Sequence, residues 1–292
     1  MTVSTWDEIR TAFHVAKMGT VSGAAEVMGV HHATVIRHID ALEAELGVKL
    51  FQRHARGYTA TEAGEDLLQV AQATDDQFAQ LVGRIRGRGE DVSGELVITS
   101  LASMSFFITP ILADFQAENP GLMVRFLGGA RLFRLEYGEA HVAIRAGAAP
   151  QQPDNVVQKY VEFPTALYAA QSYIDRFGAP KDEGELAKHR IVNADNPESR
   201  APFARWIREN VPDEAVVFRS DDDRVLRDAV VAGSGIGFLT CHEAKRYPNL
   251  VEVLPPRPEW GAPLWLVTHV DLHRTTKVQA LLKFLKDAAK AL

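Results

Sequence analysis

The most constraining feature of this sequence is the apolar spacing between positions 35 and 46, because it fits one face of a helix. Apolar side chains recur there at intervals of four, three and four residues, which aligns them along one side of an α-helix. Those side chains are Val35, Ile39, Leu42 and Leu46. Before them, the small residues Ala24 and Ala25 predict a short helix, and Gly29 predicts a sharp turn. The stretch therefore predicts a helix-turn-helix.

The opposite side of the predicted second helix carries hydrogen-bonding groups. A helix-turn-helix places this helix in the major groove of DNA, where side chains read base edges and contact phosphates. After the helix, Phe51 and Gly57 indicate a short wing with basic side chains between them. We expect DNA contacts from the start of the helix, its polar side and the wing. The expected residues are His31, His32, Thr34, Arg37, His38, Arg53 and Arg56.

The net charge of −6 does not by itself indicate a nucleic-acid binder, since DNA-binding domains are usually basic. Residues 1 to 58 are neutral overall, with six basic and six acidic side chains. Arg53 and Arg56 nevertheless lie together just after the second helix. DNA binding is therefore expected to depend on the placement of charge and on several copies of the domain.

Length and composition limit the class of protein. A chain of 292 residues is long for one compact core and predicts two or three domains. Its hydrophobic content of 46% is ordinary for a globular protein, and no apolar run is long enough to predict a membrane helix. The first residues do not resemble a signal peptide, and the single Cys241 excludes an internal disulfide. We expect a cytoplasmic protein with no membrane partner.

A long helix is predicted from about residue 61 to 86. Its apolar and small side chains alternate at spacings of four and three, which is a heptad pattern. The pattern fits either a helix packed on its own domain or a seam between two chains, and the polar surroundings favour the seam. The expected dimerisation residues are Leu67, Ala71, Thr74, Phe78, Leu81 and Ile85. The glycine- and charge-rich stretch after them predicts a hinge.

From Gly94 onward, strands and helices alternate, which predicts an α/β fold with largely parallel sheets. The expected strands are Glu95–Thr99, Met123–Leu127, Val142–Arg145, Ala166–Ala169, Val216–Arg219, Gly237–Leu239 and Leu264–Thr268. The expected helices are Ile111–Glu118, Ala201–Glu209, Asp222–Ala232 and Lys277–Leu292.

Several motifs, in order along nearly the whole chain, make the sequence similar to the LysR-type transcriptional regulators. The N-terminal motifs are Ala24-Ala25, Leu42-Glu43, Leu46-Gly47, Leu50-Phe51, Arg53 and Thr61-Glu62-Ala63-Gly64. The later motifs are Phe115 with Asn119-Pro120-Gly121, the turn Ala232–Gly237 and the strand Leu264–His269. The chain departs from the family pattern at His31-His32, at Ile36 and at His141.

The resemblance implies an α/β protein with an N-terminal all-α winged helix-turn-helix in residues 1–60. A dimerising linker helix and hinge would occupy residues 61–90. Residues 91–292 would form an effector-binding domain similar to periplasmic binding proteins, with lobe I at about 91–163 and 267–292 and lobe II at about 164–266. The implied partners are double-stranded promoter DNA, a small-molecule effector and further copies of the chain, as a dimer or tetramer. No cofactor and no enzymatic activity are implied.

Hydroxyl groups after the first α/β strand indicate an effector site. Serine hydroxyls and free amides at such a position bind anions, and Arg145 ends a neighbouring strand where α/β ligands bind. Ordinary helix capping with a solvent-facing arginine is the alternative. The turn at Gly235 and the nearby Thr240 are expected to approach from the second lobe. We therefore expect a small anionic effector at Ser100, Ser103, Arg145, Gly235 and Thr240.

Other constellations favour ordinary roles. His31 and His38 are seven residues apart, too far along a helix to hold one metal ion. The acids Asp221–Asp223 fit the positive start of a helix better than catalysis, and Cys241 has no partner thiol for redox sensing. An enzyme with an appended DNA-binding domain would need a catalytic motif that the sequence lacks. A solute-binding protein would not carry the helix-turn-helix.

Overall fold

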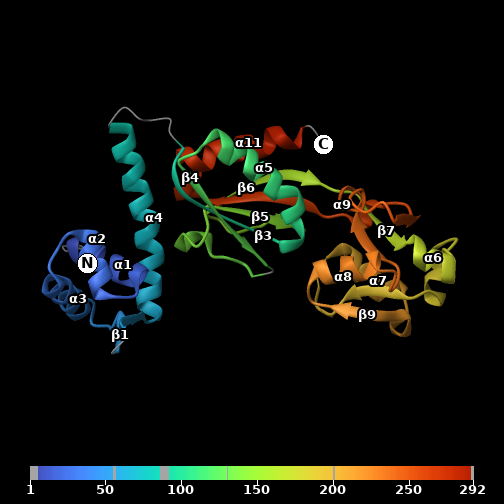
Figure 1. Cartoon of the computed structure of the whole chain (residues 1–292), viewed down its shortest axis with the longest axis horizontal. Helices are drawn as coiled ribbons and strands as arrows, with labels where there is room; N and C mark the ends of the chain where they lie inside the picture. Colours follow the sequence, from blue (N-terminus) through green and yellow to red (C-terminus); the bar gives the residue numbers. More distant parts are fainter. Residues whose placement is uncertain (1–5, 55–56, 86–91, 130, 200, 291–292) are drawn as a thin grey trace.

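The computed structural model describes the chain apart from residues 1–5, 55–56, 86–91, 130, 200 and 291–292. Several side chains near the end of the linker helix, including those of Leu81 and Ile85, also lie outside the described residues. Within the described part, no helix is both long and apolar enough to span a membrane. Figure 1 shows a small helical domain, a long helix beside it and two α/β lobes.

The N-terminal domain is a three-helix unit with a two-stranded wing. Its elements are α1 (Trp6–Met18), α2 (Val21–Met28), α3 (His32–Leu46), β1 (Phe51–His54) and β2 (Gly57–Ala60). Gly29 closes α2 with a φ of 65°, a left-handed conformation that favours glycine. The predicted helix-turn-helix is confirmed, and Val35, Ile39 and Leu42 are buried in its core. Leu46 was expected on the same stripe but is 47% exposed, because the helix runs past the core at its last turn.

The carboxylate of Glu43 joins α3 to the wing. Its side chain is almost fully buried and accepts hydrogen bonds from the backbone amides of Leu50 (3.0 Å) and Phe51 (3.2 Å). It also accepts from Lys49 at 2.6 Å and from Arg53 at 3.1 Å. Burial alone would raise the pKa of Glu43, but these hydrogen bonds outweigh burial and lower the pKa overall. The ionised Glu43 thus holds the start of the wing against α3.

The linker helix α4 (Glu62–Ile85) begins with a side-chain cap, since the amide of Gly64 donates to the Thr61 hydroxyl at 3.2 Å. Its first half packs along α1, and Leu67 belongs to the core of the N-terminal domain. Leu67 was expected at a dimer seam, but its side chain packs against the core of its own N-terminal domain. Further along, Phe78 meets the Trp6 ring edge-on at 6.3 Å. On its other side, Gln69 of α4 donates to Glu139 of the first lobe at 3.4 Å.

The first lobe is a five-stranded sheet in the order β4-β3-β5-β12-β6. Its strands are β3 (Gly94–Ser100), β4 (Leu122–Gly128), β5 (Val142–Ala146), β6 (Asn155–Glu162) and β12 (Pro263–His269). Two adjacent helices, α5 (Ser105–Glu118) and α11 (Thr276–Ala289), pack with it in one core (Figure 1). The short helix α10 (Val270–His273) follows β12.

The second lobe is built on two small sheets. Its strands are β7 (Thr165–Ala170), β8 (Ile191–Ala194), β9 (Val216–Ser220), β10 (Gly237–Thr240) and β11 (Leu250–Leu254). Its helices are α6 (Gln171–Phe177), α7 (Pro202–Asn210), α8 (Asp223–Val231) and α9 (Cys241–Ala244). Short 3₁₀ segments complete both lobes: η1 (Ala102–Met104), η2 (Leu135–Tyr137), η3 (Glu183–Lys188), η4 (Asp213–Ala215) and η5 (Pro258–Trp260).

The expectation of largely parallel sheets is only partly right. Strand β3 pairs in parallel with β4 and β5, and β8 pairs in parallel with β9. However, β12 is antiparallel to β5 and β6, and β7 is antiparallel to β10 and β11. The chain leaves the first sheet after β6 and re-enters it at β12, so the returning strand runs in the opposite direction. The elements that were not predicted include β6, β8, β11 and α6, and α5 starts before Pro110 rather than after it.

We expect the substitution Glu43→Gln to destabilise the N-terminal domain by about 2 kcal/mol or more, because a neutral amide accepts weaker hydrogen bonds from two buried backbone amides. Chemical unfolding followed by the fluorescence of Trp6, in a background where Trp206, Trp260 and Trp265 are replaced by phenylalanine, measures this loss. Since the pKa of Glu43 is lowered on folding, its contribution is present above the ordinary value of 4.5 and is lost as the pH falls through the lowered pKa. The difference between wild type and variant should therefore shrink in acid. A constant difference would contradict this assignment.

Candidate functional site

The outer side of α3 carries few side chains that could reach DNA. Arg37 and Ala41 are exposed and Thr34 is partly exposed, so these three lie on the side away from the core. In the described part of the chain, Arg37 forms no ion pair, which leaves its guanidinium free to bind another molecule. At the start of the helix, His31 is the N-cap and accepts from the amide of Ala33 at 3.3 Å.

His38 lies on the inner side of α3 instead of the DNA side. Its Nδ1 atom is 2.9 Å from the hydroxyl of Thr11 on α1, and Thr11 is fully buried. Positions 35, 38, 39 and 42 follow one helical face, so His38 lies beside the core stripe. A DNA contact from His38 stays a prediction, and in this conformation its ring is held against α1 instead. Ile36 likewise packs against the core.

Arg53 is committed to contacts inside its own domain. Its guanidinium donates to Asp40 at 2.6 Å and to Glu43 at 3.1 Å, and it lies over the Tyr58 ring at 5.3 Å. The hydrogen bond to Asp40 raises the pKa of Arg53. An arginine held by two carboxylates is poorly suited to bind phosphate, so Arg53 orients the wing. Arg56, the second expected wing contact, lies outside the described residues.

His31 and His32 are both exposed at the start of α3. Among the described residues, no group of three or more His, Cys, Asp or Glu side chains is arranged to hold a metal ion.

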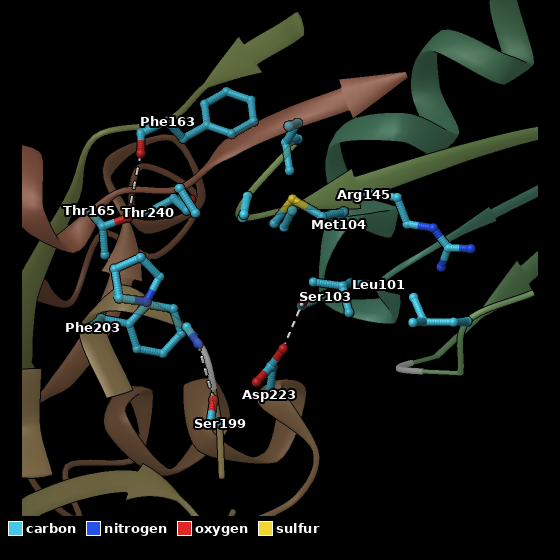
Figure 2. A pocket seen from close by; sticks show the side chains of 18 of the residues that line it. Leu101, Ser103, Met104, Arg145, Phe163, Thr165, Ser199, Phe203, Asp223 and Thr240 are labelled. Carbon is cyan, nitrogen blue, oxygen red and sulfur yellow. Dashed lines mark hydrogen bonds between the residues drawn. The ribbon is translucent and has the colours of Figure 1, made fainter. Parts of the chain in front are cut away.

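A cleft of about 850 Å³ lies between the two lobes. Three of the five expected effector residues line it: Ser103 and Arg145 from the first lobe, and Thr240 from the second (Figure 2). The walls are largely apolar, which suits a small organic ligand. The apolar lining includes Leu101, Met104, Leu132, Leu135, Phe163, Phe203, Leu226, Phe238 and Trp260.

The two other expected residues do not line the cleft. Ser100 ends β3 and is only 2% exposed. Gly235 is packed where a Cβ atom would lie 2.5 Å from the carbonyl oxygen of Arg190, so glycine is needed there for close backbone packing. His141, expected to influence the cleft, is buried and accepts from the amide of Val97 at 2.9 Å. These positions support the lobes instead.

Arg145 presents a positive charge to the cleft. Its guanidinium is partly buried and donates to the carbonyl oxygen of Phe133 at 3.2 Å. Burial lowers the pKa of Arg145, and no carboxylate in the described part of the chain forms an ion pair with it. A group of this kind is stabilised by an anionic ligand.

One hydrogen bond crosses the cleft between the lobes. The hydroxyl of Ser103, on η1 of the first lobe, donates to Asp223 at the start of α8 in the second lobe at 3.1 Å (Figure 2). Asp222 is the N-cap of that helix, since its side chain accepts a hydrogen bond from the amide of Arg224. Asp223 is therefore not used as a cap and faces the cleft.

Several cleft residues were missed by sequence reasoning. Asp223 was assigned to a helix start, and the aromatic rings of Phe203 and Trp260 were not assigned to any site. Trp260 packs edge-on against Phe238 at 5.0 Å, forming an aromatic wall in the second lobe. No local pattern marks these residues, because the folding of the second lobe brings them to one face.

Two family models match the chain. The model described as "Bacterial regulatory helix-turn-helix protein, lysR family" matches residues 6–65. The model described as "LysR substrate binding domain" matches residues 89–290. Together they span the N-terminal domain and both lobes, and most of the linker helix lies between the two matched ranges.

Curated proteins and solved structures agree with these models. The chain is 35% identical to the transcriptional activator IlvY of Salmonella typhimurium over 80% of this chain and 81% of that protein. It is 25% identical to a helix-turn-helix transcriptional repressor of Pseudomonas aeruginosa over 95% of this chain and 90% of that protein. A full-length OxyR variant from Pseudomonas aeruginosa shares the fold with a TM-score of 0.73 at 18% identity, covering 99% of this chain and 97% of the other. CrgA, a LysR-type regulator from Neisseria meningitidis, gives a TM-score of 0.59 at 22% identity, covering 98% and 99%.

Proposed function

This chain belongs to the LysR family of DNA-binding transcriptional regulators, and from that premise we propose how its parts divide the work. Residues 1–60 bind promoter DNA, residues 61–90 join two chains, and residues 91–292 bind the effector, with lobe I at about 91–163 and 267–292 and lobe II at about 164–266. The observation that carries this proposal is an exposed recognition helix and a ligand-sized cleft in one chain. The chain then acts in the cytoplasm, where promoter DNA is found, and catalyses no reaction.

In this proposal, DNA is read by the outer side of α3. Arg37 is the residue best suited to contact a base, because its guanidinium is exposed and can bind guanine with two hydrogen bonds. Thr34 and Ala41 flank it, and His31 and His32 lie at the helix start near the phosphates. Arg53 supports the wing rather than contacting DNA.

The oligomer is proposed to form through α4. The helix exposes Val70, Phe78 and Val82, and Trp6 of α1 extends the patch with 61% of its surface exposed. Apolar side chains that are this exposed favour burial against a second copy of the chain. Of the expected seam, Ala71, Thr74 and Phe78 remain candidates, while Leu67 packs in its own domain. A dimer of this kind places two recognition helices on one partly palindromic site, and two such dimers form a tetramer.

The effector is proposed to be a small molecule with an anionic group. Arg145 is partly buried at the cleft wall, and its only described partner is a carbonyl oxygen. An anion at this position replaces a weak contact with a charge-assisted one. Ser103 and Thr240 add hydroxyl groups from the two lobes. Binding across both lobes shifts their relative position and so changes how the chain holds DNA.

We expect Arg37→Ala to weaken binding to the protein's own promoter by about 1–3 kcal/mol and to relax specificity at one base pair. The measurement is a fluorescence-anisotropy titration with the promoter and with single-base variants of it. Arg274→Ala, an exposed arginine on the effector half, is the matched control for the loss of one charge. Equal affinity of Arg37→Ala and the control would refute the proposed reading of DNA.

Phe78→Asp should dissociate the oligomer, because it places a charge in an interface that is otherwise apolar. Sedimentation velocity at micromolar concentration measures the change in mass. Val270→Asp introduces the same charge at another exposed apolar residue, 48% exposed, and should leave the mass unchanged. A Phe78→Asp protein that sediments like the wild type would show that α4 serves only its own chain.

We expect small carboxylates to raise the melting temperature of the wild type and to lose this effect in Arg145→Gln, because the neutral amide does not compensate an anion. Thermal-shift measurements with matched organic acids test this. Arg125→Gln removes an arginine from the edge strand β4, away from the lining residues, and should respond as the wild type does. An effector that stabilises Arg145→Gln undiminished would exclude the anion site.

A further inference from the structure

The charged side chains that line the cleft fall into two groups. Arg227 and Glu243 form an ion pair at 3.3 Å within the second lobe, so their charges offset each other. Arg134 is paired with Glu139 in the first lobe. In contrast, the described residues give no ion pair to Arg145 or to Asp223. Glu136 and Asp221 also line the cleft without an ion pair among the described residues, but Asp223 is the acid that receives a hydrogen bond from the opposite lobe.

Asp223 receives a single described hydrogen bond, from the Ser103 hydroxyl at 3.1 Å. A carboxylate can accept about four hydrogen bonds, so the group has unused acceptor capacity. Figure 2 shows Asp223 pointing from the second lobe toward Ser103, with Arg145 beyond Ser103 in the first lobe. Arg145 and Asp223 therefore belong to opposite lobes of one cleft.

We propose that the effector is an organic acid that also carries a hydrogen-bond donor, which binds Asp223 while its carboxylate binds Arg145. The inference rests on the proposed anion site at Arg145 and adds the second recognition group. An ammonium group or a hydroxyl group of the ligand can donate a hydrogen bond to the Asp223 carboxylate. Asp223 is then the residue that selects among organic acids, because a plain acid leaves this carboxylate without a partner from the ligand.

The environment of Asp223 supports this assignment. The side chain still meets solvent in the open cleft, so a ligand can reach it, but atoms of both lobes surround it and displace part of its water. This desolvation, followed by the nearby charge of Asp222, raises the pKa of Asp223 although the Ser103 hydrogen bond lowers it. Keeping the Asp223 carboxylate ionised therefore costs free energy, and a hydrogen-bond donor from the ligand lowers this cost. The apolar walls, including Leu226 and Phe203, make the charge–donor contact stronger than it would be in water.

The test uses two sets of compounds that share a carbon skeleton. The first set is phenylalanine, phenyllactate, phenylpropanoate and phenethylamine, and the second is leucine, leucic acid, isocaproic acid and isopentylamine. Each set contains an amino acid, a hydroxy acid, a plain acid and a plain amine. Dissociation constants are measured by calorimetry and thermal shift on the full-length wild type. The proposal predicts that, in at least one set, a donor-bearing acid binds about tenfold or more tightly than the plain acid and the plain amine.

Four variants locate the effect. Asp223→Asn should abolish the preference for donor-bearing acids, while the plain acid binds the variant at least as well as the wild type. Asp221→Asn removes the same charge from the same cleft and should keep the preference, because the proposal assigns the contact with the donor to Asp223. Ser103→Ala removes the contact across the cleft and one hydroxyl of the proposed effector site, so it should weaken the acids in parallel but keep the preference. Arg145→Gln should weaken all the acids in parallel.

The outcomes separate this inference from the proposed anion site. If Arg145→Gln weakens the acids but donor-bearing and plain acids bind alike, the anion site stands and the role of Asp223 is wrong. If Ser103→Ala abolishes the preference as Asp223→Asn does, Asp223 acts only as a latch between the lobes, and the inference fails. If no acid binds, or if Arg145→Gln has no effect, the anion site and the inference fail together.

Discussion

The double passage of the chain between its two lobes is the constraint on which the ligand cleft depends. Strand β6 leads out of the first sheet into β7, and the chain returns from β11 into β12. Two covalent connections on one side of the cleft allow the lobes to move as a hinge and prevent them from separating. Phe163, at the first connection, packs against Phe107 of the first lobe at 4.9 Å and against His242 of the second lobe at 5.2 Å. The hinge therefore has a packed aromatic centre.

The N-terminal domain depends on a different interaction, a buried carboxylate. Glu43 binds two backbone amides and two cations at the junction of α3 and the wing. This group therefore sets the position of the wing relative to the recognition helix. Arg53 has a structural role for the same reason. The few free polar groups on the outer side of α3 are then left to carry the recognition.

Sequence reasoning succeeded where one local period decides the structure. The stripe of Val35, Ile39 and Leu42 indicated the helix-turn-helix, and the α/β alternation indicated seven of the strands. It did not anticipate the contact between His38 and Thr11, since a polar residue beside a core face leaves no local signal. Asp223 shows the same limit, because only the tertiary crossing of the lobes places it opposite Ser103. The different fates of Ser100 and Ser103 depend on where β3 ends, which no spacing predicts.

The contact between Gln69 and Glu139 has a thermodynamic consequence. Residues 132–136 line the cleft, and Glu139, three residues later, accepts a hydrogen bond from Gln69 of the linker helix at 3.4 Å. One short segment thus touches both the ligand cleft and the helix that carries the DNA-binding domain. Any coupling through this segment must act equally in both directions, because the free energy of coupling belongs to the pair of sites. Promoter DNA would then change the affinity of the cleft for its effector by the same factor that the effector changes the affinity for DNA, so a regulator seated on its operator would respond to a different range of effector concentration than one free in solution.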